Sequence, residues 1–291
     1  MEYEYPLFRP PSEANSLIFQ VTHGCSWNKC IFCEMYTTKS FKVKKPETIK
    51  AEIEKMKMGG ARVNKVFLAD GDALVLSTSK LLHILEELNA AFPNLRRISS
   101  YAKPKDLAAK SVQELTELKH AGLNLLYTGL ESGDDLVLNL MNKGETYQSS
   151  VEGMTKCKQA GIKSSVMIIN GLGGLKYAVQ HAVNSANLVN EIQPEYVSTL
   201  VLSFPFGIEH FKKRLQTDFE LPDTKDLLDE LGLFIANTDL ESSIFRSDHA
   251  SNYLILKGLL GKDKEMLLQK ISNAIANPGQ AFLREEWQRG L

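Results

Sequence analysis

Three cysteines near the amino end are the residues best suited to metal chemistry in this sequence. Cys25, Cys30 and Cys33 lie in the stretch GCSWNKCIFCEMY, and the 291 residues contain one other cysteine, Cys157. Structural zinc sites usually take four ligands, whereas three clustered thiolates suit an iron–sulfur cube in which one iron stays open. The C-x4-C-x2-C spacing therefore predicts a metal centre, with an iron–sulfur cluster as the favoured kind.

Two other interpretations of the cysteines remain open. His23 or Cys157 could supply a fourth zinc ligand in a non-catalytic binding protein, although a lone helical cysteine is usually a core residue. Such a protein could bind RNA through a basic run, which is more often a solvated surface, at Lys39, Lys42, Lys44 and Lys45. Alternatively, Cys25 or Cys30 could be the nucleophile of a metal-free enzyme, but no nearby motif supplies the base that this chemistry needs.

Six short apolar runs must position these residues, and each is followed by a helical pattern. The runs cover residues 17–22, 65–69, 97–101, 124–130, 165–171 and 196–202. Such continuous runs are typical of parallel strands that are buried on both faces. Pro46 predicts the start of one helix, and Ser111 with Glu114 has the spacing of a capping box at the start of another. No G-x-G-x-x-G follows the first run, which disfavours a dinucleotide-binding fold.

We therefore predict an α/β fold, a partial (β/α)6 TIM-like barrel, in which loops at the carboxyl ends of the strands carry the chemistry. The barrel core is expected to cover residues 1–210. Residues 211–291 are expected to form a C-terminal helical extension or cap, with helices at 224–237 and 263–276 on either side of the polar stretch 245–254.

The cysteine loop resembles that of the radical S-adenosylmethionine (radical SAM) enzymes. The family's usual motif is C-x3-C-x-aromatic-C after the first strand, and here Phe32 directly precedes Cys33, with one extra residue in the first gap. The resemblance implies that Cys25, Cys30 and Cys33 hold a 4Fe–4S cluster whose open iron binds S-adenosylmethionine (SAM). It also implies reductive cleavage of SAM to a 5′-deoxyadenosyl radical, which abstracts hydrogen from a substrate.

The same resemblance implies roles for residues at other strand ends. The candidates to accept hydrogen bonds from the SAM ammonium group are Asp70, Gly71 and Asp72. Candidates for the ribose or methionine part are Glu131 and Ser132, and those for the adenine are Gly171 and Leu172, with Phe32 on the other side. Each group also has a simpler alternative role. Residues 70–72 could be a solvated Asp-Gly turn, and Glu131 could pair with a lysine such as Lys103. The glycine at 171 could be purely structural.

Candidate catalytic residues on the substrate side are Tyr101, Arg246 and His249. Arg246 could hold a carboxylate or phosphate bidentately, and His249 could move a proton. The C-terminal polar stretch is expected to be either a substrate lid or a polar joint against the barrel. Because no second cysteine cluster follows residue 33, we expect no auxiliary cluster and a small or medium organic substrate.

The composition limits the kinds of partner that this protein is expected to bind. The net charge of −1 lacks the electrostatic footprint of a nucleic-acid-binding protein. No run of 18 apolar residues is present, and the amino-terminal residues lack the features of a signal peptide, so we expect a cytoplasmic protein without membrane association. The family resemblance further implies a one-electron donor such as flavodoxin or ferredoxin.

Overall fold

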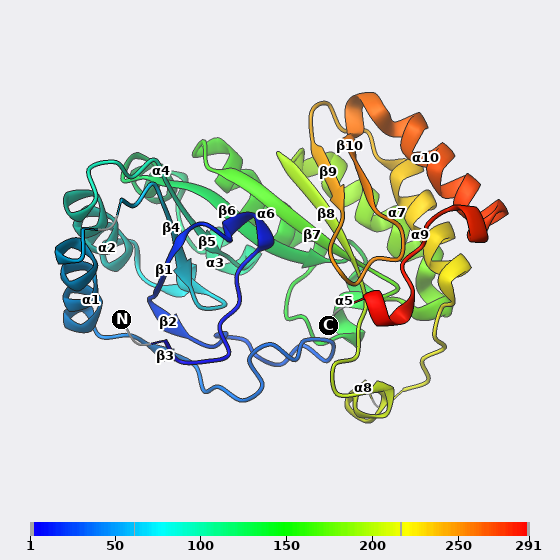
Figure 1. The fold of residues 1–291 in the computed structure, drawn as a ribbon, viewed down its shortest axis with the longest axis horizontal. Coiled ribbons are helices and arrows are strands. Elements are labelled where there is room, and N and C mark those ends of the chain that lie inside the picture. The colour runs from blue at the N-terminus through cyan, green and yellow to red at the C-terminus, as the bar shows by residue number, and fades with distance from the viewer. Residues whose placement is uncertain (1–2, 61, 216, 290–291) are drawn as a thin grey trace. The chain divides into compact units, whose positions relative to one another are not determined.

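The computed structural model describes residues 3–60, 62–215 and 217–289 as an α/β fold (Figure 1). The chain divides into two compact units. The first consists of Met1–Asn28, Met35–Thr128 and Glu152–Ser164, and the second of Lys29–Glu34, Gly129–Val151 and Ser165–Leu291. The division passes through the cysteine loop, so Cys25 belongs to the first unit and Cys30 and Cys33 belong to the second.

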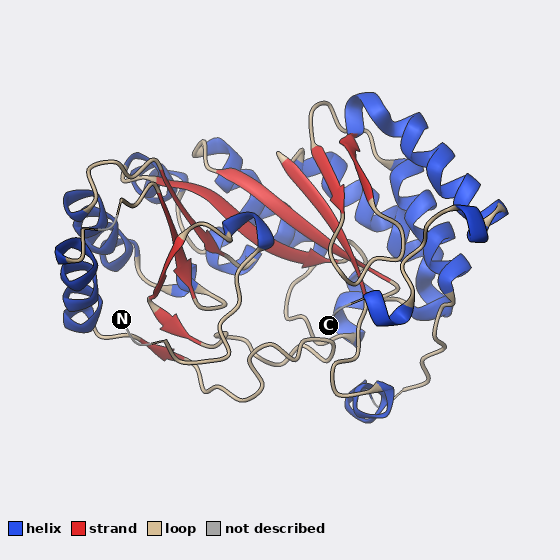
Figure 2. Ribbon diagram, in the orientation of Figure 1, coloured by secondary structure: helices blue, strands red, loops and turns tan. Residues whose placement is uncertain are grey.

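Eight strands form a mostly parallel sheet (Figure 2). In their order across the sheet they are β1 (Leu17–Gln20), β4 (Lys65–Ala69), β5 (Arg97–Tyr101), β6 (Leu123–Glu131), β7 (Lys163–Asn170), β8 (Tyr196–Val201), β9 (Ile244–Ser247) and β10 (Leu256–Leu259). A separate ladder pairs β2 (Thr22–His23) with β3 (Lys42–Val43). All six predicted strands are confirmed, and the open order from β1 to β10 confirms the partial-barrel class.

The helices of the first unit include the two whose starts the sequence predicted, at Pro46 and after Ser111. They are α1 (Pro46–Met58), α2 (Thr78–Ala91), α3 (Pro104–Ala108), α4 (Val112–His120) and most of α6 (Tyr147–Gln159), with short 3-10 turns η1 (Pro11–Glu13) and η2 (Ala73–Val75). Pro46 occupies the first turn of α1, which buries Ile49 and Ile53. The Glu114 amide donates to Ser111 Oγ at 3.1 Å and the Ser111 amide donates to Glu114 Oε2 at 2.8 Å, which confirms the predicted capping box.

The second unit contains two strands that the sequence patterns did not predict. Its helices are α5 (Asp135–Leu140), α7 (Gly174–Ile192), α8 (Ile208–Leu215), α9 (Thr224–Asn237) and α10 (Leu260–Ala276), with 3-10 turns η3 (Pro278–Gln280) and η4 (Glu286–Gln288). β9 pairs in parallel with β8, and β10 pairs antiparallel with β9. The polar stretch 245–254 therefore starts inside a strand, and the C-terminal region adds strands to the sheet as well as helices. Figure 1 shows α7, α9 and α10 beside these strands.

The sheet of the second unit has one buried face and one half-exposed face. Along β7, β8 and β9, buried residues alternate with residues that are only partly buried or exposed. The strand register aligns Met167 with Ser198, and Ser198 with Arg246, on the more exposed face. The expectation of strands buried on both faces holds for β4, but it was wrong for β7 and β8, in which fully buried and partly buried residues alternate.

Replacement of Phe245 in β9 by alanine should destabilise the protein strongly, by about 3–5 kcal/mol, because its ring is fully buried. Ile244 precedes it on the opposite face and is 38% exposed, so Ile244→Ala should change the free energy of unfolding by only about 0.5 kcal/mol. Urea unfolding of both variants measures the difference. Equal losses would contradict the assignment of β9 as a strand with alternating faces.

Candidate functional site

The cysteine loop starts directly after β2 in the first unit. Gly24 has φ of +71°, and a Cβ at this position would lie 3.3 Å from the Cβ of Lys39. Glycine therefore allows the chain to turn sharply just before Cys25. All four cysteines carry thiols rather than disulfides, and Cys25, Cys30 and Cys33 are half-buried. Thiols in this state can become the thiolates that ligate a metal.

Asp70 fastens the start of this loop. Lys39 Nζ lies 2.7 Å from Asp70 Oδ2, and both side chains are buried. The Gly24 amide donates to the same oxygen at 3.2 Å, whereas Asp70 Oδ1 has no hydrogen-bond partner among the described residues. A Cβ at Gly71 would lie 2.5 Å from a Tyr36 ring carbon, so only glycine fits there. The expectation that Lys39 forms part of a solvated basic surface was wrong, because Asp70 holds it in the interior.

Asp72 lies fully buried beside the cation Lys103. Lys103 Nζ is 3.2 Å from Asp72 Oδ2 and 3.2 Å from Asp106 Oδ2, and Ser26 donates to Asp72 Oδ2 as well. Burial and the nearby charge of Asp106 raise the pKa of Asp72 to about 7, although Lys103 and Ser26 act in the opposite direction. Asp72 Oδ1 has no hydrogen-bond partner in the described part of the chain. This carboxyl group therefore retains one oxygen that could accept from a ligand.

Arg214 of α8 holds the second half of the cysteine loop. Its Nη2 donates to the Cys30 carbonyl at 2.8 Å, and its Nη1 donates to Glu34 Oε1 at 2.8 Å and to the Cys33 carbonyl at 3.5 Å. His210 Nε2 lies 3.4 Å from the same Glu34 oxygen. A planar guanidinium can contact several acceptors at once, so Arg214 fixes the backbone that carries both cysteines.

Phe32 and Leu172 meet in one apolar cluster of the second unit. Its buried members are Val137, Met141, Leu172, Leu202, Phe211 and Leu215, and Ile31 and Phe32 pack against them. The Ile31 amide also donates to the Met141 carbonyl at 2.9 Å. Gly171 precedes Leu172 with φ of +83°. The structure thus brings together Phe32, Leu172 and Gly171, the three residues expected near the adenine.

Glu131 pairs with Lys143 and not with Lys103. Lys143 Nζ lies 3.0 Å from Glu131 Oε1 and 5.9 Å from the centre of the Phe32 ring. Burial lowers the pKa of Lys143, but the charges of Glu131 and Cys30 outweigh burial, and the net result is a raised pKa. Glu131 has φ of +67°, which is unusual for a residue with a side chain, and its Oε2 is buried without a partner among the described residues.

Ser132, expected to contact SAM, is instead part of a buried polar network. Its Oγ lies 2.8 Å from His181 Nδ1, and His181 Nε2 lies 3.0 Å from the Ile169 carbonyl. Burial lowers the pKa of His181 to about 4, so the ring is neutral. Because Nε2 must donate to that carbonyl, Nδ1 accepts the Ser132 hydroxyl. Ser132 is fully buried, which suits a positioning role.

Glu230 of α9 supports the Gly171 turn. The Gly171 amide donates to Glu230 Oε1 at 2.6 Å, and Glu230 Oε2 is buried without a partner among the described residues. Burial raises the pKa of Glu230 to about 8, although the Gly171 amide acts in the opposite direction. The neutral His181 ring lies near this carboxyl group, with Nε2 3.7 Å from Glu230 Oε1. Glu230 therefore ties the turn after β7 to the C-terminal helices.

Tyr101, a candidate catalytic residue, lies in the first unit among other aromatic rings. Its ring centre is 5.1 Å from that of Phe67 and 6.3 Å from that of Tyr127, both in edge-on arrangements. Burial raises its pKa above the usual value for tyrosine. The packing makes Tyr101 a core residue of the first unit as well as a candidate.

Arg246 and His249 both belong to the second unit. Arg246 is exposed on the half-exposed face of the sheet and has no ion-pair partner among the described residues, whereas neighbouring Lys257 pairs with Asp248 at 2.8 Å. The Ser251 amide donates to His249 Nδ1 at 3.2 Å, which places the proton of the neutral ring on Nε2. Burial, followed by the charge of Arg284, lowers the pKa of His249 and keeps it neutral.

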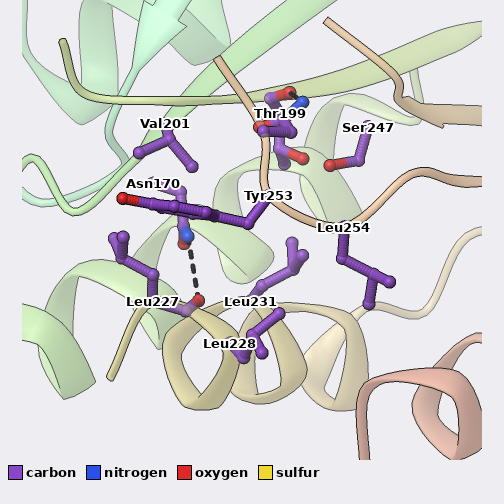
Figure 3. Close-up of a pocket in the computed structure, with 10 residues that line it drawn as sticks. Asn170, Thr199, Val201, Leu227, Leu228, Leu231, Ser247, Tyr253 and Leu254 are labelled. Atoms are coloured by element: carbon purple, nitrogen blue, oxygen red, sulfur yellow. Dashed lines mark hydrogen bonds between the residues drawn. The ribbon is translucent and has the colours of Figure 1, made fainter. Parts of the chain in front are cut away.

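A small cavity lies between the buried face of the sheet and α9 (Figure 3). Its volume is about 10 Å³, and the hydroxyls of Thr199 and Ser247 on its wall have no partners among the described residues. Figure 3 shows the Tyr253 ring lying flat between Val201 and Leu227. A space of this size suits about one water molecule and not an organic substrate. The polar stretch that contains Tyr253 thus forms, in part, a joint against the sheet.

The chemistry of the donors fits an iron–sulfur cluster. Three half-buried thiols occur within nine residues, and two of them lie in a segment beside the cations Arg214 and Lys143. Positive charge favours the thiolate form that a cluster requires. Within the described ranges, the side chains of His, Cys, Asp and Glu form no assembled group of three or more that could hold a metal ion.

Comparison with known proteins matches this sequence to a protein family. A family model described as the radical SAM superfamily matches residues 19–186, more than half of the sequence. Comparison with curated proteins finds no match.

Several solved structures share the fold. Coproporphyrinogen III oxidase from Escherichia coli is 19% identical with a TM-score of 0.61, and the match covers 76% of this chain and 51% of that enzyme. Methylornithine synthase is 15% identical with a TM-score of 0.52, over 91% of this chain and 81% of that one. A radical SAM methyltransferase from Kitasatospora setae is 18% identical with a TM-score of 0.53, over 67% and 39%. This chain spans about half the length of the first of these enzymes.

Three residues at the site carry no local sequence signal. Arg214 contacts the cysteine loop, and Lys143 contacts Glu131. Glu230 contacts Gly171. Lys143 and Arg214 stand among ordinary surface-type residues in the sequence, and Glu230 sits in a helix whose charged residues look solvated. The one hint in the sequence is an acid at the end of a buried strand, such as Glu131, because a buried carboxylate needs a cation near it.

Replacement of Arg214 by lysine should weaken metal retention by about tenfold or more, because an ammonium group cannot contact three acceptors in one plane. The measurement is iron content after anaerobic reconstitution and desalting. Lys213→Gln on the same helix removes an exposed charge and serves as the control. Equal iron in the two variants would show that Arg214 does not position the loop.

Glu230 should make stability depend on pH. Its folded pKa of about 8 lies above the ordinary value of 4.5, so the folded state binds the proton more tightly than the unfolded state. The stabilisation of the folded state by the Glu230 proton is fully present below about pH 4.5 and is lost as pH rises through about 8. Glu230→Gln should remove this fall while its amide oxygen still accepts from Gly171. Unfolding curves from pH 5 to 9 test this, and parallel pH profiles for the two proteins would refute it.

Proposed function

This chain belongs to the radical SAM superfamily, and on that premise we propose that it performs SAM-dependent radical chemistry on a small or medium organic substrate. Members of this superfamily are enzymes that bind a 4Fe–4S cluster and SAM. When bound, these groups supply a 5′-deoxyadenosyl radical: one electron breaks the S–C5′ bond, releases methionine, and leaves a radical that takes a hydrogen atom from the substrate.

The observation that carries the proposal is the cysteine loop within the family-matched region. Cys25, Cys30 and Cys33 would hold the cluster and leave one iron without a protein ligand. Asp70 fixes the entry to the loop, and Arg214 fixes its second half. These contacts hold each half of the loop within its own unit.

Acids near the strand ends would bind the polar parts of SAM. Asp70, Asp72 and Glu131 each have one oxygen paired with a lysine and one buried oxygen without a partner among the described residues. An ammonium group or a ribose hydroxyl needs such acceptors. Phe32, Gly171 and Leu172 would pack against the adenine, while Ser132 would hold the turn in place through His181.

Substrate would bind on the half-exposed face of the second unit. Arg246 would hold a carboxylate or phosphate there, because its guanidinium has no ion-pair partner among the described residues. His249 would donate a hydrogen bond through Nε2–H, and Tyr101 remains a candidate in the first unit. A one-electron donor of the flavodoxin or ferredoxin kind would reduce the cluster. In the described parts of the chain, no helix is both long and apolar enough to traverse a bilayer.

The zinc-stapled alternative finds little support in the side chains it requires. Cys157 is fully buried in α6, and its thiol lies 3.4 Å from the Ile162 carbonyl, to which it donates. His23 Nδ1 lies 3.3 Å from Glu4 Oε2. Lys39, the first residue of the basic run, is buried against Asp70. These contacts favour the iron–sulfur interpretation over a zinc site with an RNA-binding surface.

Anaerobic reconstitution should give a brown protein with about four irons per chain. Replacing Cys25, Cys30 or Cys33 singly by alanine should remove most of the iron and abolish release of 5′-deoxyadenosine from SAM with dithionite. Cys157→Ala is the matched control and should retain both properties, because this cysteine is a core residue. A colourless protein that holds one zinc, or loss of metal in the Cys157 variant, would contradict the proposal.

A further inference from the structure

We propose that Lys143, opposed by Glu131, sets the electrostatic potential at the Cys30 end of the cysteine loop and thereby the reduction potential of the cluster. This inference rests on the proposed function, because it assumes that Cys30 is a cluster ligand. It assigns Lys143 a role as a positioning charge and not as a catalytic residue. Neither the family match nor the sequence patterns single out this lysine.

Lys143 contacts the ligand segment through its backbone and through its side chain. Cys30 Sγ lies 4.0 Å from the Lys143 backbone carbonyl, to which the thiol donates. The side-chain Nζ lies 5.9 Å from the centre of the Phe32 ring, and Phe32 directly precedes Cys33. The ammonium group is therefore close to the segment that carries two of the three cysteines.

Burial makes this charge effective. The side chains of Lys143 and Glu131 are each only 11% exposed. Water and salt screen charges poorly in such surroundings, so a unit charge acts more strongly on its neighbours than it would at the surface.

The Glu131 carboxylate is held in place as the opposing charge. A Cβ at Gly129 would lie only 2.0 Å from Glu131 Oε1 and 3.4 Å from Lys143 Nζ, so glycine leaves the space that the ion pair occupies. The left-handed backbone at Glu131, with φ of +67°, directs this side chain in a way that few residues tolerate. Glu145 also acts on Lys143, but it stays in place in every variant considered below.

Arg214 differs from Lys143 in what it contacts. Its guanidinium donates to main-chain carbonyls and is neutralised by Glu34 at 2.8 Å. We therefore expect it to govern how firmly the cluster is held, whereas Lys143 governs how readily the cluster accepts an electron. The two cations can be separated experimentally because iron content and potential are different measurements.

The sign of the effect follows from charge. Reduction adds one negative charge to the cluster, so a nearby cation stabilises the reduced state and a nearby anion destabilises it. Removing the Lys143 charge should lower the potential, and removing the Glu131 charge should raise it. Loss of packing alone gives no reason for opposite shifts from the two partners of one pair.

The test uses the full chain with its cluster reconstituted anaerobically and without SAM, so that any contact of Glu131 with SAM has no influence. Potentials are measured by redox titration monitored by electron paramagnetic resonance. Lys143→Met should lower the equilibrium constant for reduction by about tenfold, which is about 59 mV for one electron, and Glu131→Gln should raise it by a similar factor. The double variant should return close to the unmodified protein.

Two controls separate charge from structure. Lys143→Arg keeps the charge and should keep the potential. Lys225→Met removes a lysine from an exposed pair on α9, whose partner Asp229 lies 2.6 Å away, and should also leave the potential unchanged. Shifts of the same sign in both single variants, or no shift with the cluster intact, would overturn the inference and leave the proposed function standing. Failure of the unmodified protein to take up iron would instead overturn both.

Discussion

Compensation of charge around the segment Cys30–Glu34 is the constraint on which the candidate site depends. A segment that offers thiolates to a cluster gathers negative charge in a half-buried place, and such charge is costly unless cations lie close to it. Arg214 and Lys143 supply these cations from α8 and from the loop after α5. Each cation also has an acidic partner, Glu34 or Glu131, and these ion pairs hold the two cations beside the segment.

The same principle organises the first unit. Asp70 is paired with Lys39, and Asp72 is paired with Lys103, yet each acid keeps one buried oxygen without a partner among the described residues. Together with Glu131, these acids form a repeated arrangement in which a lysine neutralises the charge while one acceptor remains unused. The proposed SAM ammonium group would take an acceptor of this kind, since a carboxylate without any cation would be too costly to bury before the ligand arrives.

Local signals predicted the elements of the fold, and distant contacts could not be predicted. Apolar runs identified all six barrel strands, Pro46 marked the start of α1, and Ser111 with Glu114 marked the start of α4, because each signal acts within a few residues. The cysteine motif was visible for the same reason. Arg214 contacts Cys30 across 184 positions of sequence, and no local pattern encodes such a contact. β9 was missed because its four residues, IFRS, form neither a continuous apolar run nor an alternation of apolar and polar types, and they lie in a stretch rich in hydrogen-bonding side chains.

Half-exposure of the strands in the second unit explains a further mismatch between sequence and structure. Met167, Ile169 and Leu200 make β7 and β8 look like strands buried on both sides, but these residues are only partly buried, and Ile169 packs against the apolar cluster that contains Leu172. Arg246 on the same face is exposed, and its charge is not paired within the described residues. This face therefore offers a cation for the carboxylate or phosphate group of the proposed substrate.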